Sequence, residues 1–190
     1  RQVIEDAAQW HRSGVAVVAS ANLSTLDLLN HDLVLNIQQL LTQSGLPADQ
    51  LCLEITESAL LDEPDVALKH LDELSSFGLK LSIDDYGTGQ SSLAYVKTLP
   101  VNELKIDRAF VTGVDTAPKN AAIVRSTILL CHELGLSVVA EGAETAQEMA
   151  WLKNNKCDLI QGYGIAKPMP LGEFLQWVHT FNQTRQQQET

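Results

Sequence analysis

The segment LSIDDYGTGQSS, residues 81–92, contains the most informative pattern in the sequence. An apolar run that favours a β-strand ends in two adjacent carboxylates, Asp84 and Asp85, and a loop with two glycines follows. Neighbouring negative charges repel each other, and the end of a buried strand adds a desolvation cost. Taken alone, DDYGTG is more typical of an ordinary turn, in which Asp accepts backbone N–H bonds and Gly adopts a positive φ.

Outward from this segment, short apolar runs rich in β-branched residues recur along the whole chain. The six predicted strands are VAVVASANLS (15–24), LCLEITES (51–58), LKLSIDDYG (79–87), VNELKIDRAF (101–110), LSVVAEGAE (136–144) and DLIQGYGIA (158–166). Most are separated by a segment with helical periodicity, such as residues 64–78, and residues 88–100 are long enough for a short helix. The helical stripe predicted within residues 121–135 is Ile123, Val124, Thr127, Ile128, Cys131 and Leu134. This alternation predicts βαβ crossovers and a parallel sheet.

One face of each predicted strand becomes polar only towards the C-terminal end of that strand. The polar residues at these ends are Asn22, Glu54, Asp84, Lys105, Glu141 and Gln161. Six strands that bring a polar group to one end of a sheet predict an α/β fold of the (β/α) barrel type, with the chemistry at the C-terminal mouth. An open doubly wound sheet also binds ligands at strand C-termini, but it concentrates them at one switch point.

The oxygen-bearing side chains at this predicted mouth favour hard cations. They are Asn22, Glu54, Asp84, Asp85, Asp107 and Glu141. The absence of His and Cys from this set indicates Mg²⁺ or Mn²⁺ rather than zinc or copper. One carboxylate of the Asp84–Asp85 pair would bridge two cations, an arrangement that suits in-line phosphoryl displacement. Lys105, held among cations, is predicted to have a lowered pKa and to take a proton from a metal-bound water.

Each of these residues also has an ordinary structural explanation. A lysine at a strand end, such as Lys105, is usually a solvated surface charge. Asn22 and Ser24 suit a helix N-cap, whereas Glu141 and Glu144 suit the first turn of a helix, where acids complement the dipole. These explanations do not account for six strands that become polar at the same end.

Composition narrows the class of protein. The 190 residues predict one domain, and a net charge of −11 argues against a surface for nucleic-acid polymers or anionic membranes. Three cysteines without C-x-x-C spacing fit reduced thiols of a cytoplasmic protein, and no apolar run reaches the length of a membrane span. The opening RQVIEDAAQWHRSG reads as the end of a helix, so we expect a piece of a longer membrane-bound or multidomain protein.

Several motifs occur together in one order: ANLS (21–24), LEITES (53–58), IDDYGTGQSSLAYVKTLPVNELKID (83–107), AEGAE (140–144) and QGYGIAKPMP (161–170). In this order and spacing the chain resembles, over about residues 1–178, the EAL-domain family of bacterial cyclic di-GMP phosphodiesterases. The resemblance implies a TIM-like (β/α)₈ barrel with one antiparallel strand. It also implies hydrolysis of cyclic di-GMP to linear pGpG with two Mg²⁺ or Mn²⁺ ions per site, and inhibition by Ca²⁺.

By motif, the resemblance assigns Asn22, Glu54 and Asp84 to the first metal. Asp84 would bridge to a second metal that Asp85 also holds, and Glu141 would help directly or through water. Lys105 matches the lysine proposed to activate the nucleophilic water, and Asp107 lies beside it.

The loop after the aspartate pair is implied to take part in dimerisation and activity, and it contains Gly87, Thr88 and Gly89. Glu57 matches a glutamate that anchors this loop in the family. Glu144 and Gln161 match further positions that line the site.

The chain departs from the family pattern mildly at Tyr86, commonly Phe, and at Ala143, commonly Val. The Glu-Ala-Leu motif, whose glutamate is a metal ligand, is expected upstream of residue 1 together with two strands and a helix. We therefore expect about six of the eight strands in residues 1–178 and a polar C-terminal tail at 179–190. Two open sheet edges would favour pairing, so we expect a truncated or cleaved product, a homodimer, or an assembly in which another chain completes the barrel.

Three functions agree with the sequence to different degrees. A metal-dependent phosphodiesterase agrees with every matched position, although loss of one metal ligand would impair this segment on its own. An inactive cyclic di-GMP receptor or protein-interaction module would be favoured by changes at Asp84, Asp85 or Lys105, and none is present. An unrelated barrel lyase or isomerase would leave the spacing of these motifs to chance.

Overall fold

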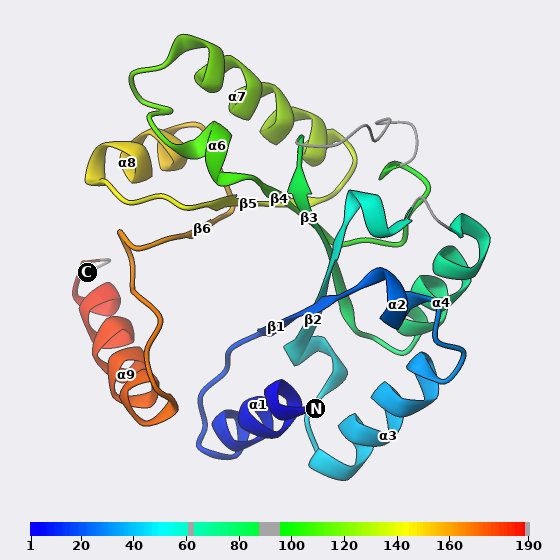
Figure 1. The fold of residues 1–190 in the computed structure, drawn as a ribbon. Helices are drawn as coiled ribbons and strands as arrows, with labels where there is room; N and C mark the ends of the chain where they lie inside the picture. The colour runs from blue at the N-terminus through cyan, green and yellow to red at the C-terminus, as the bar shows by residue number, and fades with distance from the viewer. Residues whose placement is uncertain (61–62, 88–95, 189–190) are drawn as a thin grey trace.

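The computed structural model describes residues 1–60, 63–87 and 96–188, with the backbone alone for Glu57 and residues 185–188. Within these residues six parallel strands neighbour one another in chain order. They are β1 (Ala19–Leu23), β2 (Leu51–Thr56), β3 (Lys80–Tyr86), β4 (Glu103–Ile106), β5 (Ser137–Glu141) and β6 (Leu159–Gln161). Each strand lies inside one of the six predicted runs. Figure 1 shows the sheet curled into a half-barrel, with helices outside it, which confirms the predicted α/β barrel class.

Helices separate the strands as the periodicity predicts. The α-helices are α1 (Gln2–Arg12), α2 (Thr25–Leu28), α3 (Leu33–Ser44), α4 (Pro64–Ser76), α6 (Arg108–Val111), α7 (Pro118–Glu133), α8 (Ala146–Asn154) and α9 (Leu171–Gln188). Two 3₁₀ turns, η1 (Ala48–Gln50) and η2 (Glu57–Leu60), flank β2. Most of the short helix expected within residues 88–100 lies outside the described residues. No described helix combines the length and the apolar character needed to cross a membrane.

The two faces of the sheet separate as strand alternation requires. In β2, Leu51, Leu53 and Ile55 belong to the hydrophobic core, whereas Cys52 and Glu54 line a cavity on the concave side. The same alternation places the polar group near each strand's C-terminal end on the concave side. The predicted apolar stripe of α7 is wrong at one position, because 42% of the surface of Ile123 is exposed.

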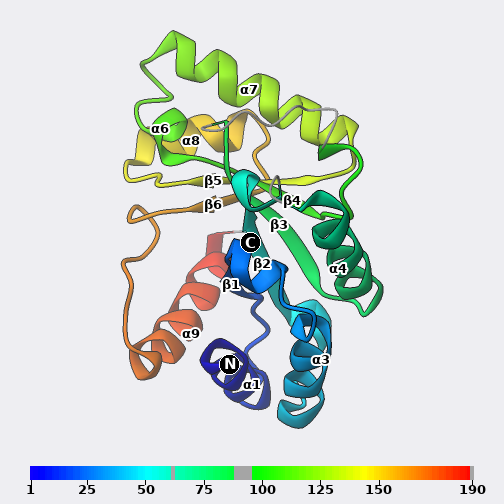
Figure 2. The same cartoon turned by 45° about the vertical axis from the view of Figure 1, so that its right-hand side comes forward.

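The C-terminal helix α9 extends into the polar segment at the end of the chain. Residues 179–188 of the predicted polar tail belong to this helix. The Phe174 ring lies 4.8 Å from the Trp10 ring between centroids, and Trp177 and Phe181 extend the aromatic row. Figures 1 and 2 show α9 beside α1, on the open side of the curled sheet.

Candidate active site

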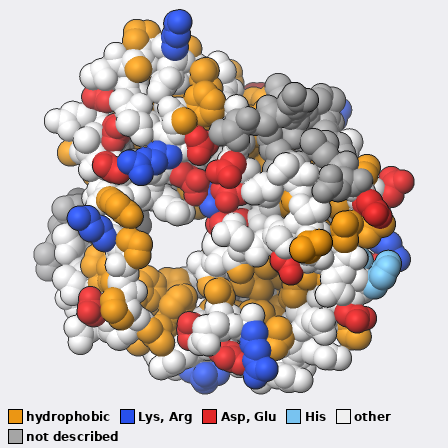
Figure 3. All heavy atoms as spheres, viewed as in Figure 1, with side chains coloured by type: hydrophobic (Ala, Val, Ile, Leu, Met, Phe, Trp, Pro, Cys, Tyr) orange, Lys and Arg blue, Asp and Glu red, His pale blue; other side chains and the backbone are white. Residues whose placement is uncertain are grey.

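The C-terminal ends of four consecutive strands bring one lysine and three carboxylates together. Nζ of Lys105 lies 2.9 Å from Oε2 of Glu54, 3.0 Å from Oδ1 of Asp84 and 2.7 Å from Oε1 of Glu141. These residues come from β4, β2, β3 and β5 in turn. Figure 3 shows acidic side chains gathered beside the central hollow of the molecule. The structure thus brings together four of the residues that the sequence placed at the C-terminal ends of the strands.

Lys105 is buried, with 3% of its surface exposed, and it is not the solvated lysine of the ordinary explanation. Burial acts to lower its pKa, but the hydrogen bonds and negative charges of Glu141 and Glu54 outweigh burial and raise it. The predicted lowering of this pKa concerned a site that holds cations, so it stays a prediction. Burial and the neighbouring Asp84 and Glu54 raise the pKa of Glu141, while Lys105 opposes them.

A break in the pairing of β3 with β4 explains how two adjacent aspartates can face one site. The pairing of β3 with β4 shifts between Ile83 and Tyr86, and Asp85 has a left-handed backbone with φ 55°. Successive strand residues normally point to opposite faces, whereas a bulge redirects one of them. Carboxylate oxygens of Asp84, Asp85 and Glu141 accordingly lie within 4.8 Å of one another. Burial and the charges of Asp84 and Asp107 raise the pKa of Asp85, so the repulsion expected from the sequence is present.

The chemistry of this donor set fits hard divalent cations. Asp84, Asp85 and Glu141 offer converging oxygens, and Oε2 of Glu54 contacts Lys105, which Asp84 and Glu141 also contact. Carboxylates are the ligands that Mg²⁺, Mn²⁺ and Ca²⁺ take, and a cation would offset the repulsion between the aspartates.

The other predicted site residues have varied positions. Asn22 pairs in register with Glu54 and is exposed at the same end of the sheet. Gln161 pairs in register with Glu141 and is also exposed. Asp107 caps α6, where its Oδ1 accepts the N–H of Ala109 at 2.8 Å.

Glu144 pairs with Arg108 in an exposed position outside the carboxylate cluster. Gly87 has φ 98°, and a Cβ there would lie 2.9 Å from the ring of Phe110. The Glu57 side chain, Thr88 and Gly89 lie outside the described residues, so their predicted roles stay predictions.

A cavity of about 340 Å³ lies on the concave face below the cluster, towards the strands' N-terminal ends. Glu54 and Lys105 line it together with residues from all six strands, among them Ser20, Cys52, Lys80, Glu103, Ser137 and Gln161. Burial raises the pKa of the Cys52 thiol to about 12, so this cysteine is an inert lining group. Burial also raises the pKa of Glu103.

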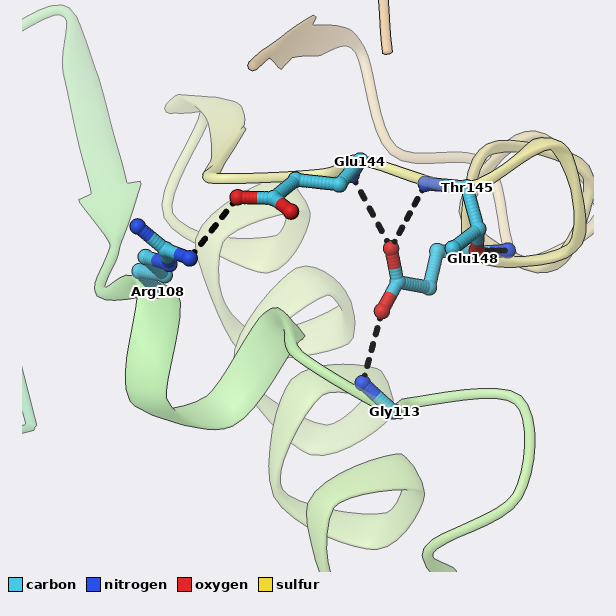
Figure 4. Close-up of polar contacts among 5 residues, drawn as sticks. All are labelled: Arg108, Gly113, Glu144, Thr145 and Glu148. Atoms are coloured by element: carbon cyan, nitrogen blue, oxygen red, sulfur yellow. Dashed lines mark hydrogen bonds and ion pairs between the residues drawn. The ribbon is translucent and has the colours of Figure 1, made fainter. Parts of the chain in front are cut away.

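Two polar residues beside the site were not predicted from the sequence. Glu148 is buried and accepts the N–H groups of Gly113, Glu144 and Thr145, at 2.7, 3.0 and 3.0 Å (Figure 4). The spacing Thr145-x-x-Glu148 is a capping box, which was a usable signal. Arg108 had no such signal, because its partner is 36 residues away.

The family model for the EAL domain matches residues 1–168. The chain belongs to the EAL domain family. Cyclic di-GMP phosphodiesterase NbdA of Pseudomonas aeruginosa is 37% identical over 182 residues, which are 95% of this EAL domain chain and 23% of NbdA. The chain thus spans about a quarter of the length of that curated relative.

Solved structures of related proteins have the same fold. The PaMucR phosphodiesterase in complex with c-di-GMP aligns with a TM-score of 0.85 and 36% identity, over 91% of this EAL domain and 70% of that chain. Klebsiella pneumoniae BlrP1 with manganese and cy-diGMP aligns with a TM-score of 0.78 and 32% identity, over 86% of this chain and 42% of that one. A calcium complex of BlrP1 aligns equally well, with a TM-score of 0.78.

Proposed function

We propose that this EAL domain hydrolyses one phosphodiester bond of cyclic di-GMP and releases linear pGpG. The observation that carries the proposal is the buried Lys105 within 3.0 Å of Glu54, Asp84 and Glu141, with Asp85 turned towards the same site by the bulge. The names of NbdA and of the PaMucR complex support cyclic di-GMP as the substrate.

Asn22, Glu54, Asp84, Asp85 and Glu141 are the residues that would hold two Mg²⁺ or Mn²⁺ ions, and Asp84 would contribute to both. When bound, such ions activate water and stabilise the charge of the phosphoryl group in the transition state. The manganese complex of BlrP1 supports Mn²⁺ as one suitable ion. Ca²⁺ is larger and accepts more flexible coordination, so we expect it to occupy the site without supporting turnover.

Lys105 is the proposed general base. Its three carboxylate partners stabilise its charged form, which cannot accept a proton. If the carboxylate oxygens were to bind cations when substrate is bound, the amine would lose this stabilisation, its pKa would fall and it would release one proton to solvent. The neutral Nζ would then accept the proton of the attacking water. Asp107, at the end of the same strand, adds negative charge near Asp85 and helps to keep the site attractive to cations.

We also propose that the edges of the described sheet pair with strands from a second copy of the chain. β1 and β6 are the first and last strands of the described order, and an exposed edge favours pairing. Light scattering after gel filtration is expected to give the mass of a dimer or larger assembly. A well-behaved monomer would contradict this proposal.

The cysteines Cys52, Cys131 and Cys157 are all free thiols, which supports a reducing compartment such as the bacterial cytoplasm as the place of action.

The test of the proposed activity is the formation of pGpG from cyclic di-GMP by this chain with Mn²⁺ or Mg²⁺, followed by chromatography. Product in amounts that scale with the protein supports the proposal. A folded chain that binds cyclic di-GMP without cleaving it would support a receptor instead.

A further inference from the structure

The chain segments that follow β4 and β5 are joined by an ion pair. Arg108 begins α6, three residues after Lys105, and its Nη2 donates to Oε1 of Glu144 at 2.7 Å. Glu144 lies three residues after Glu141. The ion pair therefore joins the two strands beyond their ends, next to the contact of 2.7 Å between Lys105 and Glu141.

The stem of Arg108 also lies against the backbone that follows Glu141. Gly142 has φ 71°, and a Cβ at this position would lie 2.8 Å from Cβ and Cδ of Arg108 and closer still to its Cγ. The left-handed backbone and the close contact both require glycine here. Since Gly142 is bonded to Glu141, the Arg108 stem limits how the backbone under the Glu141 side chain can move.

The Glu144 end of the ion pair is itself held in place. The carboxylate of Glu148, with only 5% of the residue exposed, accepts the N–H groups of Glu144 and Thr145 through one oxygen and that of Gly113 through the other. Figure 4 shows Glu148 between the loop after β5 and the loop after α6. Arg108 therefore pairs with a side chain on an anchored loop.

We propose that Arg108 is a positioning residue for Glu141: its stem holds Gly142 and its guanidinium holds Glu144, so that the Glu141 carboxylate stays aimed at Lys105 and at the candidate metal site. The inference rests on the proposed metal-dependent function. The ion pair itself is exposed, with 61% of the Arg108 side chain and 45% of the Glu144 side chain accessible. Exposed pairs contribute little to stability, so the effect should appear in metal binding rather than in folding.

The test is the affinity for Mn²⁺ alone, measured by electron paramagnetic resonance on the chain and on Arg108→Ala, Glu144→Ala and the double variant. Residues that orient metal ligands typically change affinity by about 10–100-fold, so a loss of about tenfold is expected for each single variant. Because the two residues act as a unit, the double variant should lose no more Mn²⁺ affinity than Arg108→Ala loses. Arg108→Lys, which retains a stem and a charge, should recover most of the affinity.

Arg125→Ala is the matched control, because Arg125 is also exposed and joins two helices through Asn155, at 3.0 Å. It should leave Mn²⁺ affinity unchanged and lower the melting temperature about as much as Arg108→Ala. If Arg108→Ala fails to fold, Arg108→Met retains the stem and removes the charge, and it must also bind Mn²⁺ more weakly. In steady-state assays kcat should fall more than KM rises, whereas a substrate contact would mainly raise KM.

The outcomes separate the two proposals. If the parent chain binds no Mn²⁺, or if Asp84→Ala binds Mn²⁺ as tightly as the parent chain does, the proposed metal site is overturned, and this inference with it. A parent chain that binds Mn²⁺ through Asp84, while the folded Arg108 variants bind it equally tightly, overturns the positioning role alone.

Discussion

Nζ of Lys105 lies 2.7 Å from Oε1 of Glu141 on the neighbouring strand, and two further carboxylates share the same amine. In Lys105→Met these three acids lose their buried cation. Removal of one partner from a buried charge network costs about 3–5 kcal/mol, and we expect a loss of that order in the free energy of unfolding in EDTA. Mn²⁺ should recover part of the loss, because it binds the folded state alone. Urea unfolding with and without Mn²⁺ measures both effects.

Lys69→Met is the control for this experiment. Lys69 is exposed and lies 4.0 Å from Glu73 on the same helix, so its replacement should change the free energy of unfolding by less than about 0.5 kcal/mol. Equal stability of Lys105→Met and the parent chain, in EDTA and in Mn²⁺, would show that the buried cluster does not depend on its lysine.

Much of this site could be predicted because strand alternation and register are simple rules. Glu54, Asp84 and Lys105 each lie on the face opposite the core residues of their strand, and parallel pairing brings their ends together. Asp85 breaks the alternation rule, and the periodicity gives no sign of a bulge. The sequence placed Asp85 at the site as the neighbour of Asp84, but only the shifted register and the φ of 55° explain how it can face Asp84.

Other features depended on contacts between distant parts of the chain. The raised pKa of Lys105 follows from Glu54 and Glu141 on two other strands, whose distances from the amine no sequence rule supplies. Ile123 has the spacing of a buried helix position, but other elements pack over its side of α7 only in part. How much of a helix face is buried depends on tertiary packing. The pairing of Arg108 with Glu144 likewise required the fold.

Glu148 gives a prediction about pH. Burial would raise the pKa of its carboxyl, but three backbone hydrogen bonds and the Thr145 contact lower it below the unfolded value of about 4.3. A carboxyl group whose pKa is lower in the folded state stabilises that state at pH values above its unfolded-state pKa. This contribution is lost as the pH falls through the folded-state pKa. The parent chain should therefore exceed Glu148→Gln in free energy of unfolding at pH 7, by about 1–3 kcal/mol. The difference should shrink below about pH 4.3.

Gln can serve a capping box but offers one acceptor oxygen, so Glu148→Gln cannot accept from both loops. Urea unfolding at pH 7, 5 and 4 measures the difference. Glu133→Gln, at an exposed position of α7, should change the free energy of unfolding at pH 7 by less than about 0.5 kcal/mol. A Glu148→Gln deficit that stays constant or grows from pH 7 to pH 4 would contradict the linkage.

Gly162 gives a prediction about backbone packing. A Cβ at this residue would lie 2.5 Å from N and 2.8 Å from C of Ala143, and closer still to its O. These atoms belong to the backbone just after Glu141 and cannot move aside as a flexible side chain can. We expect Gly162→Ala to lower the free energy of unfolding by at least about 1–3 kcal/mol, and to weaken Mn²⁺ binding through the displaced loop.

Gly172→Ala is the matched control, because a Cβ there meets nothing within 4 Å and the residue lies in α9. It should be neutral, or stabilising by up to about 1 kcal/mol. Thermal unfolding of the two variants makes the comparison. Similar melting temperatures for both would mean that Gly162 and Ala143 are not as close as described.

The most direct test of the proposed activity is the rate of pGpG formation from cyclic di-GMP, with Mn²⁺ or Mg²⁺, compared with Ca²⁺ and with Asp84→Ala. Asp84 contacts Lys105 at 3.0 Å and is a proposed metal ligand, so its loss should lower the rate by at least about 100-fold. Product is expected with Mn²⁺ or Mg²⁺ and should disappear in both comparisons. Product that persists at the same rate in Asp84→Ala, or a folded chain that binds Mn²⁺ and cyclic di-GMP and forms no product, would contradict the proposal.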